Sequence, residues 1–527
     1  MALLAVAAVV GLGLFLSSPH RWGERPVFNS PLQNVTYELA DRWADTGRPT
    51  ARLDRFDDLP PDIAPALTPR DAGLRDGEVV PKDHPFPVAL FALLHLLGAG
   101  LVPLATPLAG AACVVALGAL TSTLTGSRLG AAAAVGALVP TTAFWLSASN
   151  TVSSDTVGLL ALLGTALLLV RAPTSPRAVL LAGAVAGVAV TARYTNVVLV
   201  LALFAAVALA RRDARRTLLW ALPGLAVLGL AVAAYHAWLY GSPVRTGYGI
   251  GLELAARTAN PDQAGLLSFR TSALWSHVRL YLLRPEVVVL LVLGGAGLVR
   301  AALDRARPVP RWLVLVPLAG VALVLGYYAG RTTWGVQRFE ANASFLRYLL
   351  PVLALLAVYV GVLVARGGRR LRLGVGVALV VVAALAARTD VAGHGGLEVR
   401  RQADRANDAL RDDVLAATGP DALILVNRVD KVLWPQRDTL VVSYLVRSRS
   451  PQERGLASVF DLTPKPRRLS DVIRRLCAAG EEVHLLDDGD WLFPPAQAEI
   501  DLLLAARGIR RTEARAGDWQ LSTFHCA

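Results

Sequence analysis

The stretch Glu78-Val-Val-Pro-Lys-Asp-His-Pro-Phe-Pro87 closes a polar, carboxylate-rich segment and leads directly into an apolar one. It contains a cation at Lys82, a carboxylate at Asp83 and an imidazole at His84. The prolines around them stiffen the backbone and stop a helix from starting early. We therefore expect groups that can handle protons and phosphate to be held at a membrane edge. A proline-rich helix start with solvated charges is the alternative interpretation of this stretch alone.

The composition is that of a polytopic membrane protein. Of the 527 residues, 54% are hydrophobic, and the mean hydropathy is +0.48. The chain is too apolar for an average soluble protein, and apolar runs long enough to span a bilayer recur along it. The net charge of +13 comes mainly from arginines, many of them in short loops between these runs. This pattern indicates a membrane and argues against nucleic acid as a partner.

We expect about eleven transmembrane helices. The first covers Ala2 to Ser18 and is interpreted as an uncleaved span, because it lacks a basic n-region and a clear cleavage site. The first outer loop, 19–86, has aromatic residues spaced among charges, as in interfacial helices. The short apolar stretch 87–102 is re-entrant or interfacial. Further spans are expected near 104–123, 129–148, 155–170, 178–192, 197–210, 217–236, 286–299, 312–329, 348–365 and 372–387.

Arginines in four short connections predict the orientation. They are Arg171 and Arg177; Arg211, Arg212, Arg215 and Arg216; Arg300, Arg305, Arg307 and Arg311; and Arg366, Arg369, Arg370 and Arg372. If the spans alternate, all four connections lie on one side, which the positive-inside rule assigns to the cytoplasm. We therefore expect a plasma (inner) membrane protein with a cytoplasmic N-terminus and an extracytoplasmic C-terminal region. This assignment of sides depends on counting 87–123 as one crossing of the membrane. A second crossing there would place every later loop on the opposite side.

The tail from about Leu397 to Ala527 has the composition of a soluble domain. Apolar β-type runs at 422–426, 439–445 and 482–486 alternate with helical patterns near 401–416, 468–479 and 495–507, which favours a small α/β domain. A disulfide between Cys477 and Cys526 and two unpaired thiols are equally compatible with the sequence. The predicted domains are therefore a transmembrane domain at 1–390 and a soluble α/β domain at 397–527.

Two charged positions interrupt apolar runs on the expected outer side. Asp155 precedes a span, where a carboxylate can simply cap the helix. At membrane depth, however, an ionisable residue is costly and by default indicates function. Arg193, followed by Asn196, breaks an apolar run, and an outward-facing turn with a cation suited to phosphate is the simplest interpretation.

Two further groups lie on the same side. His236 could complete a divalent-metal site with His84 and Asp83 if the outer loops converge, whereas Trp238 and Tyr240 fit an aromatic belt. Arg331, Arg338 and Arg347 oppose the positive-inside trend, which an anionic lipid phosphate or phospholipid head groups would explain.

In their order along the chain, these motifs resemble the GT-C superfamily of membrane glycosyltransferases, in particular bacterial relatives of protein O-mannosyltransferases and aminoarabinose transferases. The likeness covers residues 1–390. It lies in Lys82-Asp-His-Pro85, Ser154-Asp155, the Arg193 turn, Tyr240-Gly-Ser-Pro243 and Arg347-Tyr-Leu-Leu-Pro351. The resemblance implies a GT-C-like fold and transfer of a sugar from a polyprenyl-phosphate carrier to an acceptor hydroxyl on the outer face, by an inverting displacement.

The resemblance also implies roles for individual residues. In such enzymes a carboxylate of the first outer loop deprotonates the acceptor, and basic residues hold the lipid phosphate. The expected catalytic carboxylates are Asp41, Asp83 and Asp155, and the expected phosphate-binding cations are Lys82, Arg193, Arg338 and Arg347. The family usually places an aspartate soon after the first span, where this chain has Asn29 and Ser30. As catalytic base we rank Asp41 ahead of Asp83, with Asp54 third.

Two other classes of function fit the same sequence. A transporter or flippase for a lipid-linked or anionic substrate would also need intramembrane charges, although the polar groups cluster at the outer edge and not at the midplane. A non-catalytic scaffold in envelope assembly would keep the fold without the base. Protein, lipid and polysaccharide are alternative acceptors, and membrane lipids are expected partners. No cofactor is required by the pattern beyond the divalent metal considered above.

Overall fold

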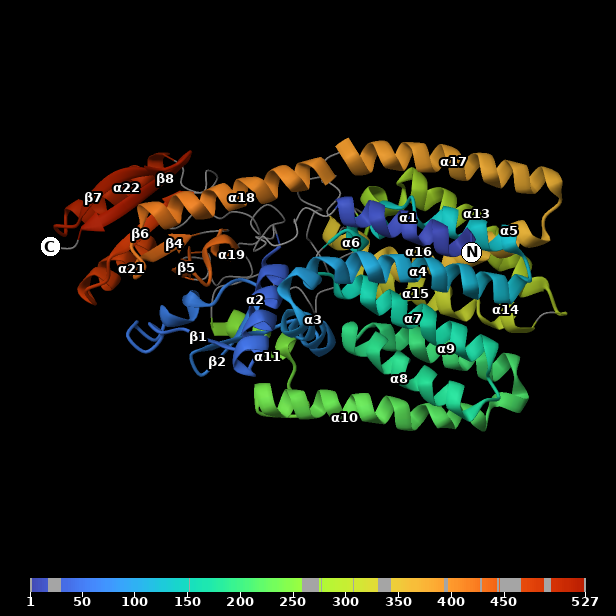
Figure 1. Ribbon diagram of the computed structural model, residues 1–527. Helices are drawn as coiled ribbons and strands as arrows, with labels where there is room; N and C mark the ends of the chain where they lie inside the picture. Colours follow the sequence, from blue (N-terminus) through green and yellow to red (C-terminus); the bar gives the residue numbers. More distant parts are fainter. Residues whose placement is uncertain are drawn as a thin grey trace.

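The computed structural model describes most of the chain, namely residues 2–17, 30–150, 152–257, 274–275, 277–306, 308–329, 343–392, 397–426, 429–442, 445, 466–487 and 494–525. It is elongated, with a bundle of helices at one end and a mixed α/β region at the other (Figure 1). The chain passes from one to the other through α17 (Arg369–Ala392) and α18 (Leu397–Ala417).

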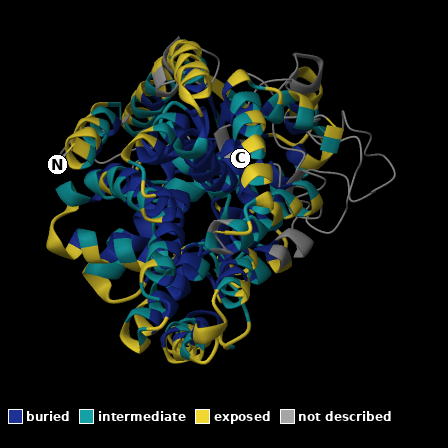
Figure 2. Cartoon of the chain, turned by 90° about the vertical axis from the view of Figure 1, so that its right-hand side faces the viewer, coloured by how far each residue is buried: buried dark blue, intermediate teal, exposed yellow. Residues whose placement is uncertain are grey.

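The bundle is built around one central helix, α16 (Ala343–Arg366). In an apolar stretch of 18 residues of α16, 83% of the residues are buried. The corresponding share is 11% for the helix that includes α10 and 17% for α17. Viewed along its long axis, the chain has buried residues in the middle and exposed residues on the outer helices (Figure 2). The other helices of the bundle are α1 (Ala2–Ser17), α4 (Val102–Thr125), α5 (Arg128–Leu138), α6 (Thr142–Ala148), α7 (Ser154–Arg171), α8 (Pro176–Ala192), α9 (Asn196–Ala210), α10 (Ala221–Tyr240), α13 (Pro285–Leu303), α14 (Pro308–Trp312) and α15 (Leu315–Leu323).

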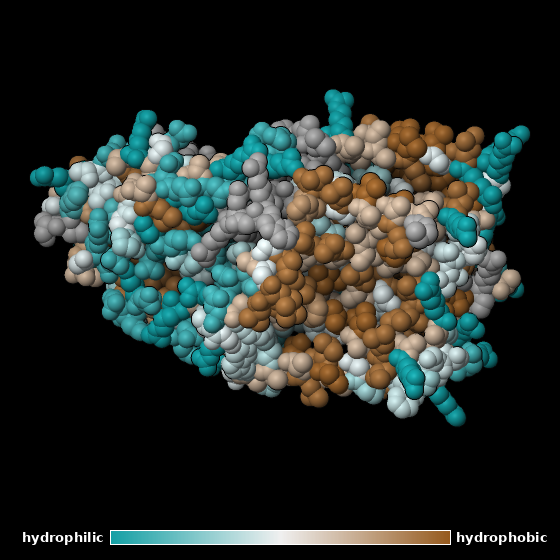
Figure 3. Space-filling model, in the orientation of Figure 1, coloured by the Kyte–Doolittle hydropathy of each residue, from teal (hydrophilic) through white to brown (hydrophobic). Residues whose placement is uncertain are grey.

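Six of the described helices are long and apolar enough to cross a membrane, or seven if the bent pair α5–α6 counts as one span. Five further apolar helices are shorter, at 10–17 residues. Each of the eleven expected spans falls on one of these helices, but the count of eleven crossings stays a prediction. Figure 3 shows a hydrophobic surface over the bundle with hydrophilic side chains towards both ends, as a bilayer requires.

The α5–α6 pair bends by 77° at residues 139–141. Pro140 has no amide hydrogen to continue the ladder, and the Thr141 side chain accepts from the Phe144 amide and starts a new helix. The next residue, Thr142, donates to the buried Glu286 carboxylate at 3.0 Å, and Arg284 donates to the same oxygen at 2.6 Å. This buried polar cluster was not predicted from the sequence.

The segment between α1 and α3, which was expected to be the first outer loop and is called the first outer segment below, contains a sheet, whereas interfacial helices were expected. Helix α2 (Pro31–Thr46) is followed by β1 (Ala51–Arg52), a 3-10 turn (Ala64–Leu67), β2 (Ala72–Arg75) and β3 (Glu78–Pro81), and α3 (Pro85–Leu97) then returns to the bundle. The strand order is β1-β3-β2, and both pairs are antiparallel. Asp76 and Gly77 form the two-residue turn between β2 and β3, with φ of 50° and 77°, the positive values that this kind of hairpin turn requires.

The C-terminal region is a five-stranded sheet with helices. The strands are β4 (Leu423–Val426), β5 (Asp438–Val441), β6 (Val483–Asp487), β7 (Arg510–Ala516) and β8 (Trp519–His525), in the order β5-β4-β6-β8-β7. The helices after α18 are α19 (Asp430–Leu433), α21 (Pro466–Ala478) and α22 (Pro494–Ala505). The three expected β-type runs fall on β4, β5 and β6. The β7–β8 hairpin was missed because exposed polar side chains dominate β7. Cys477 is disulfide-bonded, and Cys526 lies outside the described residues.

The first outer segment and the C-terminal region share one hydrophobic core. Leu59, Ile63 and Leu67 pack in the same cluster as Leu440 and Ile473. Ion pairs reinforce this contact, since Arg55 pairs with Asp438 and Glu481, Arg70 with Asp430, and Arg475 with Asp62. Residues 30–86, which the sequence placed with the transmembrane domain, are therefore packed against the C-terminal region as well.

Candidate active site

Lys82 lies at the point where β3 ends. In the β2–β3 register Ala72 faces Pro81, so the next pair along the hairpin is Asp71 and Lys82. The Lys82 ammonium donates to the Asp71 carboxylate at 2.8 Å, and it lies 5.9 Å from the ring centre of Tyr248. Burial disfavours the charged form of Asp71, but the charges of Lys82, Arg70 and Arg347 outweigh it and lower its pKa. Asp71 therefore stays ionised and holds Lys82.

Asp83 and His84 form a second pair directly before α3. One Asp83 oxygen accepts from the His84 amide at 2.8 Å and lies 3.0 Å from His84 Nδ1, while the other accepts from Thr36 at 3.4 Å. Burial opposes ionisation of Asp83, but the hydrogen bonds and charge of His84, with a contribution from Arg347, lower its pKa. Asp83 is therefore a buried carboxylate that is charged at neutral pH.

Asp155 stands at the first turn of α7, buried between two arginines. Arg193, in the turn between α8 and α9, forms an ion pair with one Asp155 oxygen, and Arg347 Nε approaches the other at 3.9 Å. Both guanidinium groups also lie over the Tyr348 ring, at 4.5 and 5.2 Å from its centre. Three segments that are far apart in the sequence thus converge on one carboxylate.

Tyr248, in α11 (Gly247–Arg257), connects these groups electrostatically. Burial and then the charge of Asp83 raise the pKa of its phenol, while Arg193 and Arg347 oppose that shift. Arg347 likewise contributes to the lowered pKa values of Asp71 and Asp83. The Tyr248 ring lies 5.9 Å from the Lys82 ammonium and 5.5 Å from the His84 ring, so the pairs that contain Lys82 and Asp83 lie beside the same phenol. Together with the Asp155 group they make up the candidate site.

An apolar seam leads away from the arginines into the bundle. We define it by two narrow cavities between α9, α15 and α16. The first is lined by Arg193, Thr195, Asn196, Leu199, Gly320, Leu323, Val324, Arg347, Tyr348, Pro351 and Val352. The second cavity also borders α4 and α7 and is lined by Leu120, Leu124, Leu162, Ala166, Leu203, Leu313, Val316, Leu355, Val358 and Tyr359. Arg193 and Arg347 therefore border the first cavity together with apolar side chains, and the second cavity is lined almost wholly by apolar ones.

Comparisons with known proteins agree with this architecture. ArnT from Cupriavidus metallidurans in the apo state superposes with a TM-score of 0.57 at 14% identity, covering 99% of this chain and 97% of that one. The same protein bound to undecaprenyl phosphate gives 0.55 at 12% identity, with the same coverage. The chain has the GT-C fold. Residues 83–240 of this GT-C chain also match the family described as dolichyl-phosphate-mannose-protein mannosyltransferase.

A third structure extends the comparison. Arabinofuranosyltransferase AftD from Mycobacteria, in a mutant form, gives a TM-score of 0.51 at 17% identity, covering 99% of the GT-C chain but 41% of AftD. No curated protein matches the chain by sequence. The likeness is therefore one of fold.

The remaining candidate residues fall outside the converging groups. Asp41 in α2 pairs with His95 of α3 at 3.0 Å, and Asp54 is exposed beyond β1. Arg338, like Arg331, lies outside the described residues. The site also contains Asp71 and Tyr248, which the sequence interpretation missed. The Asp76-Gly77 turn was the available signal for Asp71, because that hairpin places it opposite Lys82.

The two histidines expected to bind a metal share a different partner. The ring of Tyr194 lies 4.5 Å from that of His84, and its hydroxyl lies 3.1 Å from His236 Nε2. Across the described part of the chain, no three His, Cys, Asp or Glu side chains are grouped so as to hold a metal ion. His84 is instead held by Asp83, and His236 by the Tyr194 phenol, so we assign neither to a metal.

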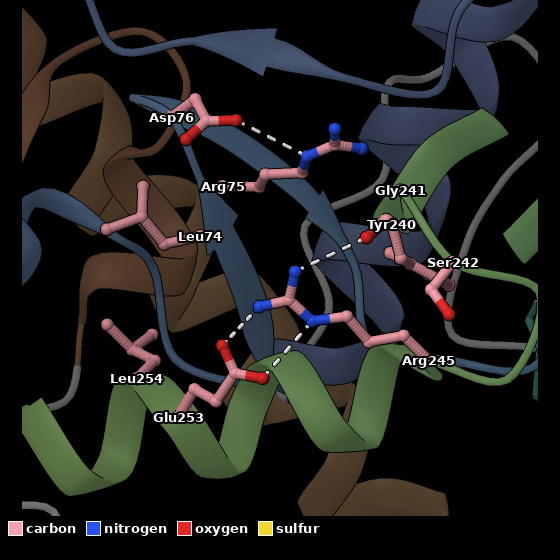
Figure 4. Close-up of a pocket in the computed structure, with 9 residues that line it drawn as sticks. All are labelled: Leu74, Arg75, Asp76, Tyr240, Gly241, Ser242, Arg245, Glu253 and Leu254. Atoms are coloured by element: carbon pink, nitrogen blue, oxygen red, sulfur yellow. Dashed lines mark hydrogen bonds and ion pairs between the residues drawn. The ribbon is translucent and has the colours of Figure 1, made fainter. Parts of the chain in front are cut away.

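A cavity of about 300 Å³ lies behind the hairpin, where β2 meets the end of α10 and α11 (Figure 4). Its charged side chains point at one another, since Arg245 pairs with Glu253 and Arg75 with Asp76. Arg75 and Arg245 also donate to the carbonyls of Leu239 and Tyr240 at the end of α10. Across this wall the Tyr240 hydroxyl donates to the Pro81 carbonyl at 2.8 Å and supports the strand that carries Lys82.

Proposed function

We propose that the chain transfers a sugar from a polyprenyl-phosphate carrier to an acceptor hydroxyl on the outer face of the membrane, with inversion at the anomeric carbon. The observation that carries this proposal is the position of Arg193 and Arg347 at the outer end of the apolar seam. A lipid phosphate needs both features at once, namely cations for its head and an apolar path for its chain.

Arg193 and Arg347 are suited to the phosphate. Asp155 and Tyr348 fix the two guanidinium groups on neighbouring positions. Each guanidinium has five donors, so contacts with Asp155 leave others for phosphate oxygens. Lys82 supplies a third cation from the hairpin side. Asp155 in this scheme orients the cations and does not itself take a proton.

The seam is suited to the polyprenyl chain. Below the arginines it is lined by Leu199, Leu323 and Val352, and further inside by aliphatic side chains together with Tyr359. Gly320 contributes no side chain where α15 approaches α16, and Val352 and Leu199 lie close to it. The related ArnT structure holds undecaprenyl phosphate, which supports a carrier of this class.

Asp83 is our proposed base, with Asp41 as the alternative. Asp83 is ionised, buried and within the electrostatic influence of Arg347, whereas Asp41 is paired with His95 on α3. In the reaction the acceptor hydroxyl gives its proton to the carboxylate, and its oxygen forms the new bond to the anomeric carbon. The bond from that carbon to the phosphate oxygen breaks, and the polyprenyl phosphate leaves with the electron pair, held by Arg193, Arg347 and Lys82.

The test is whether the purified protein releases polyprenyl phosphate from a polyprenyl-phosphate sugar. Detergent-solubilised protein is incubated with a panel of radiolabelled polyprenyl-phosphate sugars, with and without divalent metal, and free polyprenyl phosphate is measured. We expect release from one donor, and its loss in Asp83→Asn and in Asp155→Asn. Asp58→Asn, an exposed position in the same segment that is not a candidate base, is the matched control. Binding without release from any donor would instead favour the transporter or scaffold alternatives.

A further inference from the structure

The C-terminal region reaches the site through a buried ion pair. Asp430, the first residue of α19, is fully buried. Its two oxygens accept from Arg70, one from Nε at 2.7 Å and the other from the backbone amide at 2.8 Å. A buried carboxylate is costly unless it is paired and hydrogen-bonded. This contact therefore fixes the backbone of Arg70 as well as its side chain.

The residue that follows Arg70 holds Lys82. Asp71 has φ of 63°, in the left-handed region that residues other than glycine rarely adopt. Such a conformation persists only where the surroundings fix it, and here Arg70 is tied down on one side and β2 begins on the other. The turn lets two consecutive side chains face different partners, Asp430 and Lys82. A continuous chain of contacts thus links the C-terminal region to the site.

From this chain of contacts we propose that Asp430 is a positioning residue for the donor site, acting through Arg70 and Asp71 on the ammonium of Lys82. The inference rests on the proposed function, in which Lys82 binds the carrier phosphate. Lysine has a long flexible stem, and much of its freedom is lost when it binds an anion. A fixed carboxylate beside it reduces that loss before the phosphate arrives. The C-terminal region is then a part of the donor site and not only a cover.

A second ion pair between the same two parts provides the matched control. Asp62 accepts two hydrogen bonds from Arg475, at 2.6 and 2.7 Å, and so also ties the first outer segment to the C-terminal region. Asp62 is exposed, and none of its described contacts leads to Lys82. Asp62→Asn therefore weakens the attachment between the two parts without touching the Arg70–Asp71–Lys82 chain.

The experiment measures the dissociation constant of undecaprenyl phosphate with the full-length protein in detergent. The variants are Asp430→Asn, Asp71→Asn, their double mutant and Asp62→Asn, with thermal unfolding recorded for each. We expect about tenfold weaker binding in Asp430→Asn, the effect of losing one hydrogen-bonded charge contact, and less than about twofold in Asp62→Asn. The double mutant should bind undecaprenyl phosphate about as weakly as whichever single mutant has the lower affinity, because both substitutions act on Lys82.

Three outcomes would overturn the inference. They are unchanged binding in Asp430→Asn, additive effects in the double mutant, and tighter binding in Asp71→Asn, which would mean that Asp71 competes with the phosphate for Lys82. If Asp430→Asn does not fold, Arg70→Lys keeps the charge and the backbone amide contact but removes the Nε donor, and weaker binding by less than about tenfold is expected. If the wild-type protein fails to bind undecaprenyl phosphate, the proposed function itself is wrong and the inference falls with it.

Discussion

Replacement of Gly320 by valine would test whether the seam holds the carrier chain. A Cβ atom at Gly320 would lie 2.8 Å from Val352 Cγ2 and 3.3 Å from Leu199 Cδ2. The first distance is about 1 Å shorter than an optimal contact between two carbon atoms. The cavity beside it has a volume of about 10 Å³, which is at the lower limit for holding one water. The valine methyl groups therefore have to occupy the space that a lipid chain would need.

The expected loss of affinity follows from the cost of overpacking. Inserting methyl groups into a packed site costs about 1–3 kcal/mol. If binding has to meet that cost, the dissociation constant for undecaprenyl phosphate rises roughly 5- to 150-fold. The matched control is Gly229→Val in α10, where a Cβ atom meets nothing within 4 Å and the expected change is less than about twofold.

The assay is titration of the detergent-solubilised protein with undecaprenyl phosphate, with circular dichroism and thermal unfolding to show that each variant is folded. A folded Gly320→Val variant that binds as tightly as the wild type would refute the assignment of the seam to the carrier chain. Equal weakening in Gly229→Val would show that any valine in the bundle perturbs binding and would remove the support for this location.

Three further predictions concern stability. Tyr240→Phe removes the hydrogen bond to Pro81 and should cost about 1 kcal/mol of unfolding free energy in a denaturant titration. The pKa of Asp83 is lower in the folded protein than in the unfolded chain, so ionised Asp83 stabilises the fold fully above the unfolded pKa. This stabilisation is lost as the pH falls through the folded pKa. Asp83→Asn should therefore make the melting temperature depend less on pH in the acid range. Arg55→Ala removes the ion pairs with Asp438 and Glu481 and should cost about 2 kcal/mol of unfolding free energy, seen as faster proteolysis of the C-terminal region. Unchanged proteolysis would contradict the role of these ion pairs.

The helices of the bundle could be predicted because hydrocarbon selects for long apolar runs. Each expected span overlaps a helix, since the apolar run and the helix have the same cause in a bilayer. The number of crossings could not be fixed in the same way. Ala2–Ser17, Pro176–Ala192 and Asn196–Ala210 are apolar but short, and composition alone does not separate a short span from a helix packed inside the bundle.

The site was predicted in part. Asp155, Arg193 and Arg347 stood out because a charge in an apolar run is costly, and the structure brings these three together. Asp41 was ranked first for its place after the first span. Four residues earlier on the same face of α2, Tyr37 also contacts His95, so helical periodicity directs both towards α3.

Asp71 and the shared core could not be found from apolar periodicity. Asp71 is one of many acidic residues in a polar segment, and only the pairing of β2 with β3 places it beside Lys82. The contacts of Ile63 with the C-terminal region join residues more than 350 positions apart, and nothing in the local pattern of either segment specifies the other. Such pairings are properties of the folded chain.

The shared core also constrains the order in which the protein can form. A chain is made from its N-terminus, so the first outer segment emerges long before β5 and α21, which cover its apolar side chains. Until then the side chains of Leu59, Ile63 and Leu67 are not fully packed, and the segment that carries Lys82 cannot reach its final position. Contacts of such long sequence separation close slowly and late. The candidate site is therefore completed only after β5 and α21 have been synthesised.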